Sequence, residues 1–209
     1  VMILKDHAKD MTIEKPEGYD PEVFYCASES DNCKMSEKMN RTLWPKDSLL
    51  SYGRLPNGKV MINWPINGND YYVNAIEQTE EERQQSFEKA KLKSLQFLYY
   101  LQTELGFNTY GLVDDEFPTD DGFPLIPYHR ESRRIQGITT LTVNHIAQPY
   151  DQQQALYRTG IAVGDYPVDH HHASHPDAEN LPELHFYPVP SYNLPIGCLF
   201  PQSIDHFIV

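Results

Sequence analysis

Residues 79–105 constrain the fold most, because their pattern predicts one long amphipathic helix. Thr79 followed by Glu82 is a capping-box pattern, and glutamates fill positions 80–82, at the positive end of the helix dipole. Gly106 is typical of the residue just past a helix C-terminus. Apolar residues recur on one face, with Ser94 as the gap: Phe87, Ala90, Leu98, Leu101 and Leu105. Such a face predicts core packing, not chemistry.

The sequence before this helix predicts a hairpin. Residues 50–55 and 59–64 flank Pro56-Asn57-Gly58, and Asn-Gly supplies the positive φ angles of a tight hairpin turn. Residues 1–50 form an irregular N-terminal part that is rich in charge and turn signals.

After the helix the sequence predicts strands over 138–143 and 160–164, and a proline-rich extended tail over the last thirty residues. Together the elements predict an α+β fold, with a mixed or mostly antiparallel sheet, one long packed helix and long loops. The alternating elements of a doubly wound parallel fold are missing from the sequence.

Charge and hydropathy exclude two classes of partner. The chain has 17 basic and 30 acidic residues, a net charge of −13 that disfavours binding to nucleic acid. No stretch approaches the roughly 18 apolar residues of a membrane span. The start at Val1 and the apolar end at Val209 suggest a segment of a longer polypeptide, so the sequence predicts no localisation.

The cysteine count is odd, which is poor support for a disulfide framework. Three unpaired thiols, Cys26, Cys33 and Cys198, are the simplest interpretation. A Cys26–Cys33 pair across the turn-forming residues between them is the alternative.

Arginine is concentrated in one segment of this acidic chain, at Arg130, Arg133 and Arg134. Guanidinium groups offer paired donors that match carboxylates and other oxyanions, so the segment is a candidate ligand site. The alternative is a structural role, in which the arginines pair with the acidic loops at 114–116 and 120–121.

Histidine is concentrated between Asp169 and His175. Asp169 could orient His171 as a general base. His171 and His175 have helical metal-ligand spacing, but prolines bracket the stretch and no second ligand pair exists, so no metal site is predicted. Surface or packed histidines are the plainer alternative.

A third candidate is the loop that contains Asn63, Trp64 and Asn69, where amides and aromatic rings together could bind a sugar or another polar ligand. Turn chemistry explains the same residues without a ligand.

These segments, in this order, resemble the FAD-dependent oxidoreductase family common in bacterial genomes, some of whose members carry a xanthan lyase label. The resemblance covers roughly residues 55–209. Its most specific part is Arg-Glu-Ser-Arg-Arg at 130–134. The sequence departs from the family pattern at Gly197, where arginine is usual, and at His129, where an aromatic residue is common. Weaker matches lie at 63–65, 68–70, 97–102, 125–129, 135–137, 166–171, 192–196 and 204–209.

The resemblance implies that residues 1–209 form a single substrate-side (cap) domain excised from a longer FAD-dependent oxidoreductase. Its partners would be the FAD-binding domain of the same polypeptide and a small-molecule or saccharide substrate. The sequence has no glycine-rich phosphate loop, so this segment is not expected to hold FAD or to be active alone.

The resemblance also implies roles for single residues. Arginines would hold or polarise an oxygen-rich group while the flavin accepts hydride, and His171, oriented by Asp169, would move a proton. The implied catalytic residues are Arg130, Arg133, Arg134, Asp169 and His171. The implied substrate-binding residues are Asn63, Trp64, Asn69, Tyr128, His129 and Tyr192.

Two other classes of function stay open. The loop at 63–74 is compatible with a carbohydrate-binding domain that has no catalysis. Tyrosine, histidine and arginine are also suitable groups for a polysaccharide lyase that acts on acidic glycans, and such a lyase would act without flavin.

Overall fold

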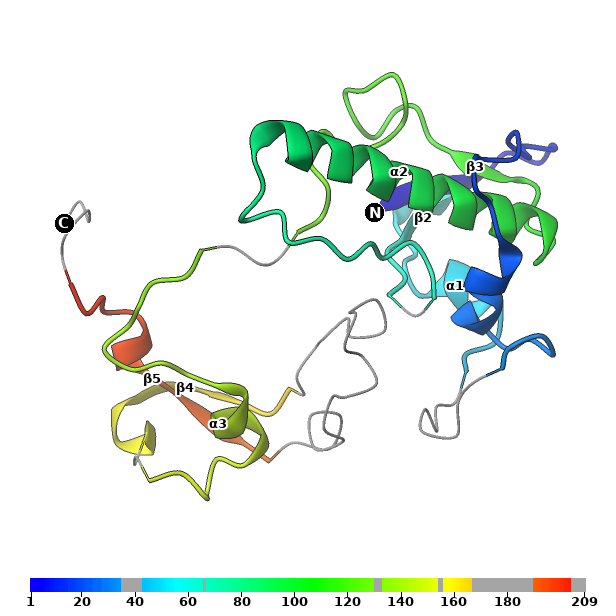
Figure 1. The fold of residues 1–209 in the computed structure, drawn as a ribbon. Coiled ribbons are helices and arrows are strands. Elements are labelled where there is room, and N and C mark those ends of the chain that lie inside the picture. Colours follow the sequence, from blue (N-terminus) through cyan, green and yellow to red (C-terminus); the bar gives the residue numbers. More distant parts are fainter. Residues whose placement is uncertain (35–42, 66, 130–132, 154–155, 167–189, 204–209) are drawn as a thin grey trace. The chain divides into compact units, whose positions relative to one another are not determined.

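The computed structural model describes residues 1–34, 43–65, 67–129, 133–153, 156–166 and 190–203 (Figure 1). The chain divides into two compact units. Unit 1 comprises Val1–Arg130 with Ala173–His175, and unit 2 comprises Glu131–His172 with Pro176–Val209. Small antiparallel sheets and one long helix confirm the predicted α+β class.

Unit 1 contains a three-stranded antiparallel sheet, with β1 (Met2–Asp6) between β2 (Lys59–Ile62) and β3 (Tyr110–Leu112). Leu4 of β1 lies opposite both Val60 and Leu112. The central strand therefore comes from the N-terminal region in which the sequence indicated no regular element. Its Met2, Ile3 and Leu4 are buried in succession, a run that carries no two-residue alternation to mark it as a strand.

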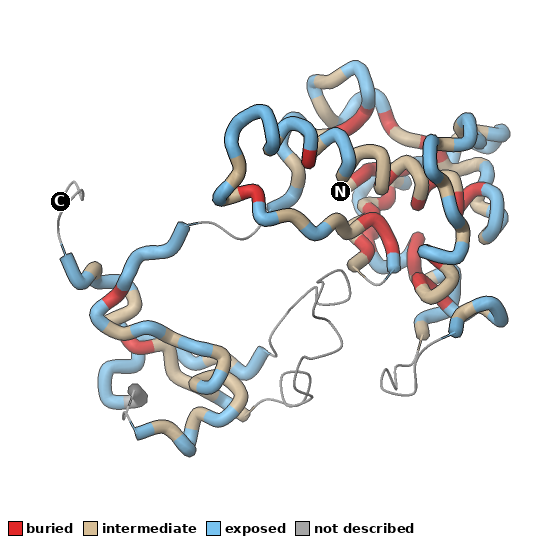
Figure 2. Tube along the Cα trace, in the orientation of Figure 1, coloured by how far each residue is buried: buried red, intermediate tan, exposed pale blue. Residues whose placement is uncertain are grey.

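The long helix α2 (Glu80–Thr103) is confirmed together with its capping box. The backbone N–H of Glu82 bonds the Thr79 hydroxyl at 3.3 Å, and the Glu82 carboxylate accepts the Thr79 backbone N–H at 2.9 Å. Gly106 has φ +80°, which suits the predicted stop. Burial differs from the predicted face. It is greatest in the second half of the helix, where Phe97, Leu98, Tyr100, Leu101 and also Ser94 are buried, while Phe87 and Ala90 are only partly so (Figure 2).

The predicted hairpin is wrong in its first strand. Residues 48–51 form a short helix, α1 (Ser48–Ser51), which buries the consecutive Leu49 and Leu50. A strand would point these two side chains to opposite faces, whereas a helical turn buries both. The turn itself is confirmed, because Asn57 and Gly58 have φ of +65° and +71°, and Arg54 pairs with Val60 in an isolated bridge.

A buried glutamine of α2 holds the N-terminal segment in place. The Gln102 side chain is 2% exposed; its Oε1 accepts the backbone N–H of Ile13 at 3.0 Å. Its Nε2 donates to the backbone carbonyls of Met11 and Tyr110, each at 2.8 Å. One side chain thus joins α2, the segment after β1 and the start of β3.

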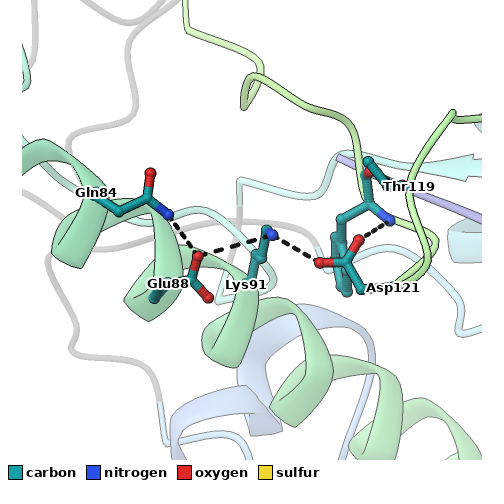
Figure 3. A network of polar contacts seen from close by, with 6 residues as sticks. Gln84, Glu88, Lys91, Thr119 and Asp121 are labelled. Atoms are coloured by element: carbon teal, nitrogen blue, oxygen red, sulfur yellow. Dashed lines mark hydrogen bonds and ion pairs between the residues drawn. The ribbon is translucent and has the colours of Figure 1, made fainter.

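The acidic loop after β3 is fixed by lysines. Lys91 of α2 contacts Asp121 at 2.7 Å and Glu88 at 3.8 Å, and the Asp121 carboxylate also accepts the backbone N–H of Phe123 at 3.0 Å (Figure 3). Lys59 of β2 contacts Asp115 and Glu116 at 2.7 and 2.8 Å. These pairs are partly exposed and contribute little free energy individually, but they orient the loop.

Unit 2 is described as α3 (Val143–Ala147) and a two-stranded antiparallel sheet of β4 (Gly160–Gly164) and β5 (Tyr192–Pro195). The prediction of β4 is confirmed. The strand predicted at 138–143 is wrong, because Thr142 and His145 form a capping box that begins α3. The prediction that the tail lacks regular structure is wrong at β5, which ends at Pro195. Among the described residues of unit 2, only Gly137 and Pro195 are buried.

Candidate functional site

Asn69 is buried, and both ends of its side-chain amide bond the backbone of its own loop. Oδ1 accepts the backbone N–H of Trp64 at 2.8 Å, and Nδ2 donates to the carbonyl of Ile62 at 3.1 Å. The side chain is 8% exposed. The described contacts of Asn69 are therefore those of a loop clamp, in agreement with the turn-chemistry alternative. Its role in binding substrate stays a prediction.

Trp64 belongs to the hydrophobic core and is 5% exposed. Its indole Nε1 donates to the carbonyl of Ala27 at 2.8 Å. Gly68 packs so closely on it that a Cβ there would lie 2.4 Å from the Trp64 carbonyl oxygen, so the turn requires glycine. Asn63, by contrast, is only partly buried and precedes the clamp.

Two aromatic residues that the sequence analysis missed surround Trp64. The Trp44 and Tyr52 rings lie edge-to-face against the Trp64 ring, with centroids 5.4 and 5.7 Å away, and 6.0 Å from each other. We call Trp44, Tyr52 and Trp64 the aromatic triad. Trp44 and Tyr52 lie outside the segment that drew attention, and no local pattern links them to Trp64.

A disulfide lies in the loop that carries the triad's backbone contacts. Cys26 and Cys33 are bonded, so the interpretation of three unpaired thiols is wrong; Cys198 is a free cysteine. Ala27 and Glu29 of this loop bond the two tryptophans, since the Glu29 backbone N–H donates to the Trp44 carbonyl at 2.9 Å. An odd count of cysteines excludes complete pairing only, and did not bear on this pair.

The arginine segment is exposed where it is described. Tyr128, His129, Arg133 and Arg134 are all exposed, and Arg130 lies outside the described residues. The division between the two units falls within this segment. The acidic loops that could have neutralised it are paired instead with Lys59 and Lys91. Arginine pairing to those loops is thus not needed to explain how the loops are held.

The histidine candidates Asp169 and His171 lie outside the described residues, so no geometry is assigned to them. Tyr192 is partly buried on β5, opposite Gly164 of β4. Its ring lies against Gly164, where a Cβ would come within 2.7 Å of the ring carbon Cζ, and its hydroxyl donates to the Tyr166 carbonyl at 3.4 Å. The described ranges contain no group of three histidine, cysteine, aspartate or glutamate side chains that could hold a metal ion.

The described part of the chain does not fit the pyrophosphate of FAD. A dinucleotide is normally held where backbone N–H groups at a helix N-terminus meet its phosphates. The first turn of α2 carries Glu80, Glu81 and Glu82, whose carboxylates would repel phosphate. Its capping box already occupies backbone N–H groups there, and the strands around it are antiparallel.

Comparison with known proteins gives one match. The model of a family described as FAD dependent oxidoreductase matches residues 2–209. No curated protein and no solved structure shows a significant match. In the described residues no helix combines the length and apolar character needed to cross a membrane. Because the family match spans nearly the whole chain, the protein belongs to the FAD dependent oxidoreductase family.

Proposed function

We propose that this chain is the substrate-side part of a flavin-dependent oxidoreductase, and that FAD is bound by a separate domain of the same polypeptide. The family match over residues 2–209 carries the proposal. The misfit between the α2 N-terminus and a pyrophosphate supports the second half of it.

Exposed apolar residues support a partner domain for unit 2. Ile161 and Val163 of β4 alternate with Ala162, so their side chains share one face, and they are 54% and 70% exposed. A two-stranded sheet is marginal without packing on another surface. We therefore propose that this face packs against the FAD-binding domain.

The arginine segment is the proposed substrate contact. Arg133 and Arg134 are exposed, together with Tyr128 and His129. Guanidinium groups would orient a carboxylate or hydroxyl-rich substrate through paired hydrogen bonds. Arg130 and the Asp169–His171 pair keep their proposed roles of polarising the substrate and moving a proton. When bound, FAD supplies the hydride acceptor.

The test uses the full-length gene product, purified and examined for a flavin absorption spectrum. Candidate oxygen-rich substrates are added under anaerobic conditions, and bleaching of the flavin is followed. Arg134→Ala should slow bleaching about a hundredfold or more. Arg158→Ala, which removes an equally exposed arginine of unit 2, is the matched control and should leave the rate unchanged. A flavin-free full-length protein would overturn the proposal, and equal rates for both variants would remove Arg134 from it.

Docking of unit 2 is tested separately in the same protein. Val163→Asp introduces a charge on the proposed docking face, whereas Ala162→Asp introduces it on the other face of β4. Val163→Asp should lower the flavin content of the purified protein and Ala162→Asp should not. If both variants retain wild-type flavin content, the face at Ile161 and Val163 is not the docking surface.

A further inference from the structure

Unit 1 displays two large aromatic rings at its surface that its own fold does not cover. Trp44 is 46% exposed and Tyr52 is 56% exposed, although each packs edge-to-face on the buried Trp64. Rigid exposed aromatic rings expose apolar area to water, and such groups frequently mark binding sites.

The exposed rings are held firmly from beneath. Trp64 is fixed by the Asn69 clamp and by its bond to Ala27. The Trp44 backbone is bonded to Glu29, and Tyr52 ends α1 with its backbone N–H bonded to the Ser48 carbonyl at 2.9 Å. Because the rings are already ordered, a ligand that stacks on them would lose little side-chain entropy from the protein.

The surroundings of the two rings are hydrophilic. Exposed Pro45, Lys46 and Asp47 follow Trp44, and exposed Ser51 and Arg54 flank Tyr52. The apolar surface is therefore confined to a patch about the size of two rings, too small for a membrane or a stable protein interface. It suits an amphipathic ligand with ring-sized apolar faces and a polar rim.

Charge narrows the ligand further. Acidic residues outnumber basic ones in the described part of unit 1, so an anionic ligand would be repelled at long range. A pyranose fits all three conditions, because its C–H groups form an apolar face and its hydroxyls form a polar rim.

We propose that the aromatic triad is a binding site for a neutral saccharide. Trp44 and Tyr52 stack against C–H faces of neighbouring sugar rings, Trp64 fixes the geometry from below, and Ser51 and Arg54 provide hydrogen-bonding groups at the rim. The site goes beyond the proposed function and depends on no flavin chemistry.

Intrinsic fluorescence is a direct probe, because the chain has 2 tryptophans and both belong to the triad. The 209-residue chain is titrated with neutral oligosaccharides of glucose, mannose and xylose, and with an oligogalacturonate as the acidic counterpart. A saturable change is expected with at least one neutral ligand. Trp44→Ala and Tyr52→Ala should each weaken binding about tenfold or more, while Tyr150→Ala, an exposed tyrosine of unit 2, should not.

Thermal unfolding checks that each variant is folded; Trp44→Ala keeps Trp64 as the probe, and Tyr52→Ala decides if Trp44→Ala does not fold. Three outcomes overturn the proposal: no response to any neutral ligand, wild-type affinity in the folded triad variants, or binding of the acidic ligand only. Because flavin is absent from this titration, its failure leaves the oxidoreductase proposal intact, and a flavin-free full-length protein leaves the saccharide site intact.

Discussion

The replacement of Asn69 by alanine is expected to destabilise unit 1 strongly. The substitution leaves the Trp64 N–H and the Ile62 carbonyl, both in buried residues, without their partner. An unsatisfied buried backbone group costs about 1 to 3 kcal/mol. Partial replacement by water lowers the sum for two groups to about 2 to 4 kcal/mol.

The assay is equilibrium unfolding in urea, followed by tryptophan fluorescence at the triad. With a denaturant slope of about 2 kcal/mol/M, the midpoint of Asn69→Ala should fall by about 1 to 2 M. Asn63→Ala is the matched control, because the same residue type in the same loop is only partly buried, and its midpoint should change by less than about 0.3 M.

Equal midpoints for the two variants would refute the clamp. Asn69 would then be available for the ligand contact that the family resemblance implies. Asn69→Asp offers a further check, since a carboxylate accepts from Trp64 but cannot donate to the Ile62 carbonyl. Burial against that carbonyl should raise the pKa of the new carboxyl group, so its destabilisation should be smaller below about pH 4 and grow as the pH rises.

Three more perturbations test the fold of unit 1. Gln102→Leu removes hydrogen bonds to three partly buried backbone groups and should cost about 2 to 4 kcal/mol of unfolding free energy in the same urea assay; an unchanged midpoint would show that water replaces the amide. Loss of the Cys26–Cys33 bond, by reduction or by Cys26→Ser with Cys33→Ser, should cost about 2 to 3 kcal/mol and shift the fluorescence of the triad to longer wavelength; an identical emission maximum before and after reduction would contradict the link between this loop and the tryptophans. Burial raises the pKa of Tyr100 to about 12, so its contribution to stability is complete below pH 10 and is lost as the pH rises from 10 to 12; ultraviolet titration of phenolate should show a late, unfolding-linked step that Tyr100→Phe removes.

The candidate site could be predicted only in part. Asn63, Trp64 and Asn69 were identified as a group because amides and aromatics are close together in the sequence, and Trp64 and Asn69 do lie together in the structure. Their described contacts are made with buried backbone, which neighbouring residue types cannot reveal. The arginine segment was found because it reverses the sign of the chain's charge, a property that needs no structure, and its residues from Arg133 onward are exposed.

The sequence by itself determined the elements whose hydrogen bonds and backbone angles are local. The capping box of α2 joins Thr79 and Glu82, three residues apart, and the turn at Asn57-Gly58 depends on the freedom of those two residues to adopt positive φ. The α+β class followed from such local signals, and the family resemblance from short motifs.

Tertiary structure alone decided the contacts between segments that are distant in the sequence. The centre of the sheet is β1, because its buried residues satisfy two partner strands at once. Trp44 and Tyr52 meet Trp64, and Gln102 bonds Ile13 across 89 positions of sequence. Each of these contacts depends on the paths of two segments through space, and loop closure allows many partners for the same residue until the core selects one.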